Sequence, residues 1–217
     1  GVMSWDDFLA RGDATSEKEV HERIEALEPR GLATLIYTSG TTGPPKAVML
    51  SHENLVWTAD VLKEAAFADP PAGGMRTLSY LPLSHIAEQM VSIHCAVTLG
   101  NTVYFAESID TVAANLREIA PKVFLGVPRI WEKLQQGILM RMQDATRLQR
   151  WAFARCFESG KSLFERVEQR GGQRTLGDRL QFGLLWLLMF RNLQKFVGLD
   201  RMRCGFCGGA SVSPEVL

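Results

Sequence analysis

The residues best suited to chemistry lie in ten consecutive positions, 37–46, which read YTSGTTGPPK. Four serine or threonine residues, two glycines, two prolines and a lysine follow Tyr37. Glycine lets the backbone turn sharply and approach a ligand closely, and backbone N–H groups together with hydroxyls can surround an anion. Lys46 adds a positive charge, and a charge-assisted hydrogen bond contributes about 1.5–3 kcal/mol. The pattern therefore predicts a loop that binds polyphosphate.

Two other interpretations explain this loop less well. A flexible loop of serine, glycine and threonine accounts for the glycines but not for the lysine or the two rigid prolines. A Walker A loop beginning at Gly40 needs glycine at position 45 and serine or threonine at position 47. This sequence has Pro45, which lacks an N–H, and Ala47, which lacks the metal-binding hydroxyl. The loop therefore belongs to another class.

The composition is that of a globular protein. The 217 residues are 46% hydrophobic and 22% charged, which suffices for a sizeable core. The formal net charge is zero, so no overall field attracts nucleic acid and none is predicted as a partner. Four cysteines do not make a disulfide framework in a chain this long. Cys204 and Cys207 form a single CxxC, which suits a redox pair or, as we favour, two small residues at the end of a buried strand.

Apolar periodicity predicts strands and helices in alternation. A buried strand at 32–38 leads into the loop, and a second strand follows at 47–50. Ser51 is then expected to cap a helix that runs to about position 66. Further strands are predicted at 76–81, 101–106 and 122–127, with helices at 84–98 and 110–119. This alternation predicts an α/β fold with a layered, largely parallel sheet and flanking helices.

The chain changes character after position 128. Residues 129–199 carry no strand signal, and we expect a helical insert over 135–200 before a strand returns at 201–206. Aromatic and small residues recur at helical spacing within it, at Phe153, Phe157, Gly160, Phe164 and Val167. A second helix at 176–197 is apolar on nearly every face, so burial against its neighbour is the favoured role. Covering a ligand tunnel or resting on a membrane surface are the alternatives.

The sequence contains no signal for export or for crossing a membrane. The first 30 residues are acidic and lack the apolar segment of a signal peptide. The longest apolar run, 184–190, is far shorter than the ~20 residues that a membrane helix needs. We therefore predict a soluble cytoplasmic protein whose one route to a membrane is peripheral contact through 176–197. Because the chain opens on Gly1 and stops at Leu217, just after a predicted helix start, we expect an incomplete domain.

Residues 37–55, YTSGTTGPPKAVMLSHENL, closely resemble the phosphate-binding loop of the adenylate-forming (AMP-forming) acyl-CoA synthetases. The family pattern is Tyr-Thr-Ser-Gly-Thr-Thr-Gly-x-Pro-Lys-Gly, and nine of its ten specified residues agree in order. Ala47 stands where the family usually has glycine. The resemblance implies that Lys46 is a catalytic cation and that Thr38 contacts Mg²⁺. The residues implied to bind ATP are Thr38, Ser39, Gly40, Thr41, Thr42, Gly43 and Lys46.

Two downstream segments extend the resemblance to the reacting acid. Residues 80–90, YLPLSHIAEQM, are similar to a family motif whose histidine, here His85, lies beside the carboxylate and is catalytic. The alternative for His85 is a helix-start residue that hydrogen bonds only to backbone. Residues 126–134, GVPRIWEKL, resemble a segment typical of the long-chain and bubblegum-type branches. From helical spacing alone, Trp131 and Leu134 are expected to be core residues.

A third segment, 207–215, reads CGGASVSPE and resembles the family segment that borders adenine and the acyl pocket. The resemblance implies that Gly208, Gly209 and Ala210 contact the nucleotide. Cys207 replaces the usual serine and Ser211 replaces the usual proline. The two glycines still permit close approach of the backbone to a ring.

The resemblance covers nearly the whole chain and implies a reaction. In this family a carboxylate attacks the α-phosphate of ATP, and CoA then displaces AMP from the acyl-adenylate. The implied substrate is a long-chain fatty acid, and residues 1–217 would be part of the large N-terminal AMP-binding domain. The family's magnesium-binding glutamate motif, ribose-binding aspartate motif and small C-terminal domain have no counterpart in these residues, so we expect the fragment alone to be inactive. The alternative function is a non-catalytic nucleotide-binding module, a pseudoenzyme.

Overall fold

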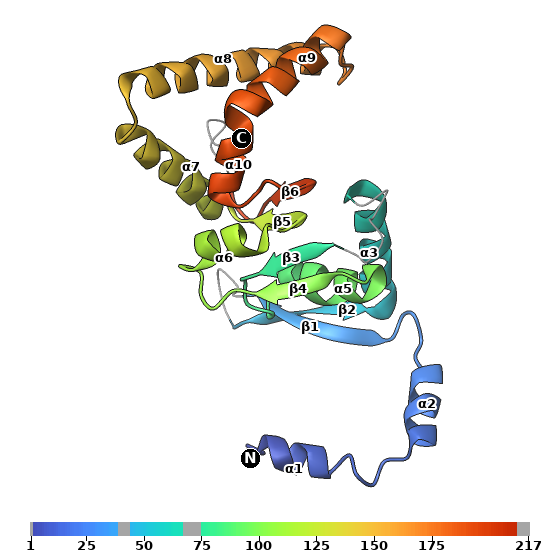
Figure 1. The fold of residues 1–217 in the computed structure, drawn as a ribbon. Helices are drawn as coiled ribbons and strands as arrows, with labels where there is room; N and C mark the ends of the chain where they lie inside the picture. The colour runs from blue at the N-terminus through green and yellow to red at the C-terminus, as the bar shows by residue number, and fades with distance from the viewer. Residues whose placement is uncertain (1, 39–43, 67–74, 212–217) are drawn as a thin grey trace. The chain divides into compact units, whose positions relative to one another are not determined.

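The structure, a computed structural model, describes residues 2–38, 44–66 and 75–211. The chain divides into two units, Gly1–Val61 and Leu62–Leu217. Helix α3, His52–Ala66, begins in the first unit and ends in the second. Figure 1 shows the elements of each unit.

The first unit contains a β-hairpin. Strand β1, Leu32–Thr38, pairs antiparallel with β2, Lys46–Ser51. The sequence predicted both strands within a largely parallel sheet, but the connection between them is too short for a parallel crossover, which needs a dozen or more residues. The strand predicted to be buried at 32–38 is also mostly open: Ile36 is buried, whereas Tyr37 is exposed. A two-stranded sheet has too few neighbours to cover both of its faces.

Short helices precede this hairpin. Helix α1, Trp5–Ala10, and helix α2, Glu17–Glu25, each begin after a serine whose hydroxyl accepts a backbone N–H, at Ser4 and Ser16. Helix α1 is only six residues long and buries no side chain. Apolar periodicity therefore gave no signal there.

Helix α3 starts where the sequence predicted. The Asn54 N–H donates to the Ser51 hydroxyl over 3.2 Å, and the Ser51 N–H donates to the Asn54 side-chain oxygen over 3.1 Å. These reciprocal bonds satisfy two donors at the helix start. The cap therefore fixes the point at which the hairpin becomes a helix.

The second unit contains a four-stranded parallel sheet, which confirms the predicted α/β class. Its strands are β3, Arg76–Ser79; β4, Thr102–Phe105; β5, Val123–Gly126; and β6, Cys204–Cys207. They lie in the order β4-β3-β5-β6. The chain thus moves outward from β3 to β4 and returns past β3 to β5. The direction of winding reverses between β3 and β5.

Each face of this sheet carries its own core. Leu78 and Phe124 pack against α6, Val112–Ile119, and against α7, Pro128–Gln143, and α10, Arg191–Val197. On the other face, Val123 packs with Met75, Leu62 and Leu99. Neighbouring residues on a strand point to opposite faces, which explains why Val123 and Phe124 enter different cores. Helix α4, Ile86–Gln89, the π-helix η1, Met90–His94, and α5, Cys95–Leu99, connect β3 to β4.

The segment between β5 and β6 is helical, as predicted for 129–199. After α7 come α8, Arg147–Gln169; α9, Leu176–Leu185; the π-helix η2, Trp186–Phe190; and α10. Helices α7, α8 and α9–α10 form three sides of a triangle in Figure 1. The helical region begins earlier than 135 because Pro128 occupies the first helical turn, where its missing N–H costs no hydrogen bond.

The 176–197 helix is buried against its neighbour, the role favoured from the sequence, on one side only. Leu185, Met189 and Val197 are buried. Five leucines of the same helix are between 58% and 78% exposed: Leu176, Leu180, Leu184, Leu187 and Leu188. Helix α8 packs along only part of this helix's circumference, which leaves these leucines, here called the leucine face, uncovered in the second unit. Among the described residues, no helix is both long and apolar enough to cross a bilayer.

The turn between α8 and α9 is fastened by a carboxylate. Asp178 accepts hydrogen bonds from the Thr175 hydroxyl at 2.7 Å, the Thr175 N–H at 2.8 Å and Arg170 Nη1 at 2.8 Å. The bonds from Thr175, followed by the bond from Arg170, lower the pKa of Asp178 to about 2. A carboxylate with a lowered pKa stabilises the fold above its unfolded-state pKa near 4, and this contribution disappears as pH falls toward 2.

We predict that Asp178→Asn lowers the melting temperature at pH 7 by roughly 2–4 °C, the effect of about one lost hydrogen bond in a chain of this size. Thermal unfolding followed by circular dichroism at pH 7, 5 and 2.5 measures the difference from wild type. The difference should persist at pH 5 and shrink at pH 2.5. The exposed Asp200→Asn is the control; an Asp178→Asn difference unchanged at pH 2.5 contradicts this explanation.

Candidate active site

Three of the segments singled out in the sequence lie at one edge of the parallel sheet. Tyr80 follows β3, Val127 follows β5 and Gly208 follows β6. Parallel strands end at the same edge, and open α/β sheets bind ligands outside this carboxyl edge, where the direction of winding reverses. Here that reversal falls between β3 and β5. The topology therefore brings together motifs that are far apart in the chain.

A hydrogen bond joins the ends of β3 and β5 at this reversal. The Val127 N–H donates to the Tyr80 hydroxyl over 2.9 Å. Burial raises the pKa of Tyr80, with a further contribution from the Glu88 carboxylate, while the bond from Val127 opposes the rise. The hydroxyl is therefore protonated at neutral pH. Sequence reasoning gave Tyr80 no role, although a tyrosine directly after a buried strand was a signal.

Three aromatic rings, those of Tyr80, Phe124 and Trp131, pack together next to this edge of the sheet. The Tyr80 and Phe124 ring centroids are 5.7 Å apart, and those of Phe124 and Trp131 are 5.6 Å apart. Trp131 Nε1 donates to the Gly126 carbonyl over 3.0 Å. A Cβ at Gly126 would lie 2.5 Å from Trp131 Nε1, so the close packing requires glycine. The expectation that Trp131 and Leu134 belong to the core is confirmed, with Leu134 buried and Trp131 partly buried.

His85 is exposed and caps helix α4. Its Nδ1 accepts the Ala87 N–H over 3.2 Å. The helix predicted to start at Ser84 therefore begins two residues later, at Ile86, since His85 itself is the cap. An Nδ1 that accepts a hydrogen bond leaves Nε2 as the nitrogen that carries a hydrogen. The backbone contact considered as an alternative thus exists, and it still leaves a donor for a carboxylate.

A buried carboxylate lies behind His85. Glu88 is 3% exposed, and it accepts the Leu81 N–H over 3.1 Å and the Ser92 hydroxyl. Buried polar groups are stable only when they are hydrogen bonded. These bonds fasten the turn after β3 to the helix that carries His85. The sequence did not predict that Glu88 is buried, because a charged residue on so short a helix is expected to lie on its exposed face.

The segment after β6 leaves its backbone open. A Cβ built at Gly208 would have no heavy atom within 4 Å, and one at Gly209 would meet only Val127 Cγ1, at 3.9 Å. Gly209 has φ = +87°, a conformation that favours glycine. Gly209 and Ala210 are exposed. A flat ring could therefore lie against this backbone, as the sequence predicts for adenine. The rest of that motif, from 212 onward, lies outside the described residues.

An apolar cavity of about 310 Å³ adjoins the same segments. It lies between the sheet and the helices that follow β3, and its lining includes Ala87, Met90, Cys95, Val123 and Phe206. Ala87 is the residue whose N–H binds His85. Cys207, next to Gly208, also lines the cavity. A carboxylate near His85 could therefore have its alkyl chain in apolar surroundings.

Of the loop residues implied to bind ATP, the structure describes Thr38 and Lys46. Thr38 and Lys46 are exposed and face each other in the hairpin register. The Thr38 hydroxyl donates to the Lys46 carbonyl over 3.3 Å, which leaves its oxygen lone pairs available to a cation. Ser39, Gly40, Thr41, Thr42 and Gly43 lie outside the described residues.

The described residues were also compared with the requirements of a metal site and of a redox cysteine pair. Within 2–38, 44–66 and 75–211, no group of three or more histidine, cysteine, aspartate or glutamate side chains could hold a metal ion. Cys204 and Cys207 are free thiols on β6, with Cys204 half-buried and Cys207 exposed. The strand is therefore less buried than the sequence predicted.

The parallel α/β sheet, with winding that reverses at an open carboxyl edge, defines a class of domain that binds ligands at this edge. The family model described as AMP-binding enzyme matches residues 3–217, and the chain belongs to this family. It is 37% identical over 222 residues to the long-chain-fatty-acid–CoA ligase ACSBG2 of Gallus gallus, covering 99% of this chain. The chain spans 28% of that ligase's length.

Solved structures share the fold. The adenylation domain of a carboxylate reductase from Mycobacterium chelonae has a TM-score of 0.54 and 21% identity, covering 87% of this chain and 24% of its own. A two-domain structure of carboxylic acid reductase from Segniliparus rugosus, in complex with AMP, has a TM-score of 0.54 and 22% identity, covering 97% and 25%. At these identities the likeness concerns the fold alone.

We predict that Tyr80→Phe lowers the free energy of unfolding by about 1–2 kcal/mol, because the Val127 N–H loses its acceptor. Urea denaturation measures the change. Tyr104→Phe is the matched control, since Tyr104 lies on β4 and its hydroxyl makes no such bond among the described residues. Equal unfolding free energies for the two variants would show that the bond does not hold the edge together.

Proposed function

We propose that residues 1–217 are part of the large N-terminal domain of an AMP-forming ligase. The ligase activates a long-chain fatty acid with ATP and transfers the acyl group to CoA. The observation that carries this proposal is the meeting of His85, the open Gly208–Ala210 backbone and an apolar cavity at one sheet edge. The likeness to the chicken ligase supports the fatty acid as substrate.

In the first half-reaction, the fatty acid carboxylate attacks the α-phosphate of ATP and pyrophosphate leaves. Such transfer depends mainly on positioning and on stabilising negative charge. Lys46, exposed at the start of β2, supplies positive charge to the departing pyrophosphate, together with the N–H groups of Ser39–Gly43. In the second half-reaction, the CoA thiol attacks the acyl carbonyl and AMP leaves.

His85 orients the acid in this proposal. Its Nε2–H donates to the carboxylate, while Ala87 holds Nδ1. The alkyl chain enters the 310 Å³ cavity behind the histidine. Adenine lies against the backbone of Gly208, Gly209 and Ala210. His85 is thereby a positioning donor for the reacting acid.

Mg²⁺ would be held by the phosphate oxygens of ATP, by water and by the Thr38 hydroxyl. Mg²⁺ prefers oxygen ligands and usually retains several waters, so one exposed hydroxyl beside bound phosphates suits it. When bound, it supplies charge that neutralises the polyphosphate. Thr38 contributes by presenting its oxygen at the end of β1, beside Lys46.

A peripheral contact with the cytoplasmic face of a membrane is part of the proposal. The leucine face of 176–197 lies on the side of the helix away from buried Leu185 and Met189. Asp178 is the one acidic residue in 176–197, and it is buried and paired with Arg170. The exposed cations Arg179, Arg191 and Lys195 remain. Exposed leucines with flanking cations suit a surface of anionic lipid.

We predict that Lys46→Ala slows fatty-acid-dependent exchange of pyrophosphate into ATP by about 10²–10³-fold in the full-length protein, because one charge-stabilising donor is lost. Lys63→Ala, which removes an exposed lysine from α3, is the matched control and should match wild type. Exchange by wild type with no fatty acid, or ATP binding without exchange for any chain length, would exclude the ligase.

We predict that Leu187→Asp weakens sedimentation with phosphatidylcholine–phosphatidylserine vesicles at least tenfold, because a leucine removed from water contributes about 1.5–3 kcal/mol. The melting temperature should match wild type, since Leu187 is exposed. Val97→Asp removes an exposed apolar residue elsewhere and is the control. If Leu187→Asp melts earlier and still binds vesicles, the leucine face is covered by protein rather than by lipid.

A further inference from the structure

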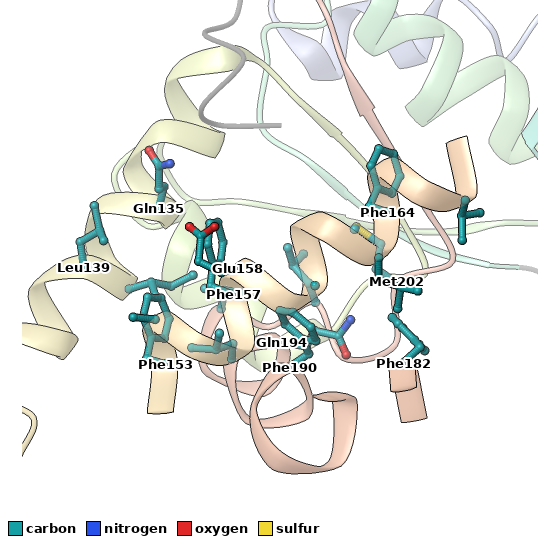
Figure 2. A pocket seen from close by; sticks show the side chains of 18 of the residues that line it. Gln135, Leu139, Phe153, Phe157, Glu158, Phe164, Phe182, Phe190, Gln194 and Met202 are labelled. Atoms are coloured by element: carbon teal, nitrogen blue, oxygen red, sulfur yellow. The ribbon is translucent and has the colours of Figure 1, made fainter. Parts of the chain in front are cut away.

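The helical segment encloses a second, larger cavity. It has a volume of about 870 Å³ and is lined by residues of α7, α8, α9, η2 and α10. Figure 2 shows side chains from these helices converging around it. It shares no lining residue with the cavity beside His85 or with the glycine segment after β6. The proposed ligase mechanism does not use it.

The walls of this cavity are largely aromatic and aliphatic. Five phenylalanines line it: Phe153, Phe157, Phe164, Phe182 and Phe190. The rings of Phe153 and Phe157 stack with centroids 6.0 Å apart. A Cβ at Gly160 would lie 2.7 Å from the Phe190 ring, so glycine lets this ring close against α8. The helical stripe noted in the sequence therefore forms one wall of a cavity instead of a closed helix–helix seam.

The polar groups of the lining are unevenly engaged. Asp178 is held by Thr175 and Arg170, and Gln194 accepts a hydrogen bond from Trp186. Arg174 lies over the Phe182 ring, with 5.5 Å between the guanidinium carbon and the ring centroid. Among the described residues, Arg174 makes no ion pair of 4 Å or less. It is therefore a cation whose charge a ligand could neutralise.

Besides Asp178, the cavity lining contains one acidic residue, Glu158, which lies away from the Phe182 ring that Arg174 covers. Glu158 projects on the side of the cavity near Gln135 and Leu139, whereas Phe182 lies on the opposite side in Figure 2. An anionic group beside Arg174 would thus be separated from the Glu158 carboxylate. The charges of the cavity favour one orientation for an elongated anionic ligand.

We propose that this cavity binds one long alkyl chain that ends in an anionic head group, with the head at Arg174 and the chain against the phenylalanine walls. The volume falls within the roughly 300–1,000 Å³ of small-molecule sites. A polar, flat ligand would leave its hydrogen-bonding groups unpaired against these rings. A free fatty acid and a fatty acyl-CoA share the required chemistry. The site stands without the ligase activity, because binding here requires neither ATP nor the phosphate loop.

Direct binding tests the site in the absence of nucleotide. The full chain is titrated with cis-parinaric acid, a fatty acid whose fluorescence rises in apolar surroundings, and displaced with fatty acids of increasing length. We expect a saturable component of one site per chain that substitutions in the 870 Å³ cavity weaken, in addition to any binding in the cavity beside His85. Affinity should rise about fourfold for each added methylene until the cavity is filled. Palmitate and palmitoyl-CoA are compared as displacers. Displacement by either one supports the site and shows whether the ligand is the free acid or the acyl-CoA. Displacement by neither overturns the proposal.

Substitutions in the walls locate the bound chain. Phe157→Glu should weaken cis-parinaric acid at least tenfold, whereas Trp151→Glu, on the same helix but outside the lining, should change it less than twofold. Both side chains are substantially exposed, Phe157 at 49% and Trp151 at 60%. Should Phe157→Glu melt earlier than wild type, Leu139→Glu on α7, 50% exposed, replaces it.

The head group is tested through its charge. Arg174→Glu should weaken the acid about five- to tenfold and leave its uncharged methyl ester unaffected, while Arg155→Glu, an exposed arginine outside the lining, should leave both unchanged. Equal effects of Phe157→Glu and Trp151→Glu, or equal losses for acid and ester in Arg174→Glu, overturn the proposal. A failure of pyrophosphate exchange with binding intact would affect only the proposed ligase function.

Discussion

The geometry of the candidate site depends on the parallel alignment of β3 and β5. These strands meet through a single register pair, Thr77 with Val123, and the bond from the Val127 N–H to the Tyr80 hydroxyl extends their contact beyond the strand ends. Because the winding direction reverses between them, the helices after β3 and after β5 cover opposite faces of the sheet. The carboxyl edge is therefore open between β3 and β5. His85 lies on the segment after β3, and Gly209 lies on the segment after β6, which is parallel to β5.

Buried polar groups and glycines stabilise this edge for different reasons. Glu88 fixes the turn that carries His85 by accepting a backbone N–H and a hydroxyl. Gly126 makes room for Trp131, and Gly209 adopts a conformation that other residues rarely tolerate. Rigid positioning of donors before the substrate arrives is what electrostatic catalysis requires. The helical segment is built differently, with apolar side chains left on open faces and around a cavity.

Local sequence patterns predicted most elements but few of their contacts. The strands at 32–38 and 122–127 and the helix at 176–197 follow from apolar periodicity, and the phosphate loop from its glycines and lysine. The bond between Tyr80 and Val127 joins residues 47 positions apart, which periodicity cannot predict. The sequence did not predict the uncovered leucine face for a related reason. An apolar helix shows that burial is favourable, but the sequence does not specify which side a neighbour covers.

The central claim is that the carboxyl edge of the parallel sheet binds the acyl-adenylate. Calorimetric titration of the full-length protein with palmitoyl sulfamoyl adenosine, an unreactive analogue of that intermediate, tests it directly. Gly209→Ala and Gly172→Ala impose similar backbone strain, since φ is +87° and +86°, but Gly172 lies in the turn after α8. We expect Gly209→Ala to weaken the analogue at least tenfold and Gly172→Ala to leave it unchanged. Equal affinity in both variants would contradict the assignment of the site.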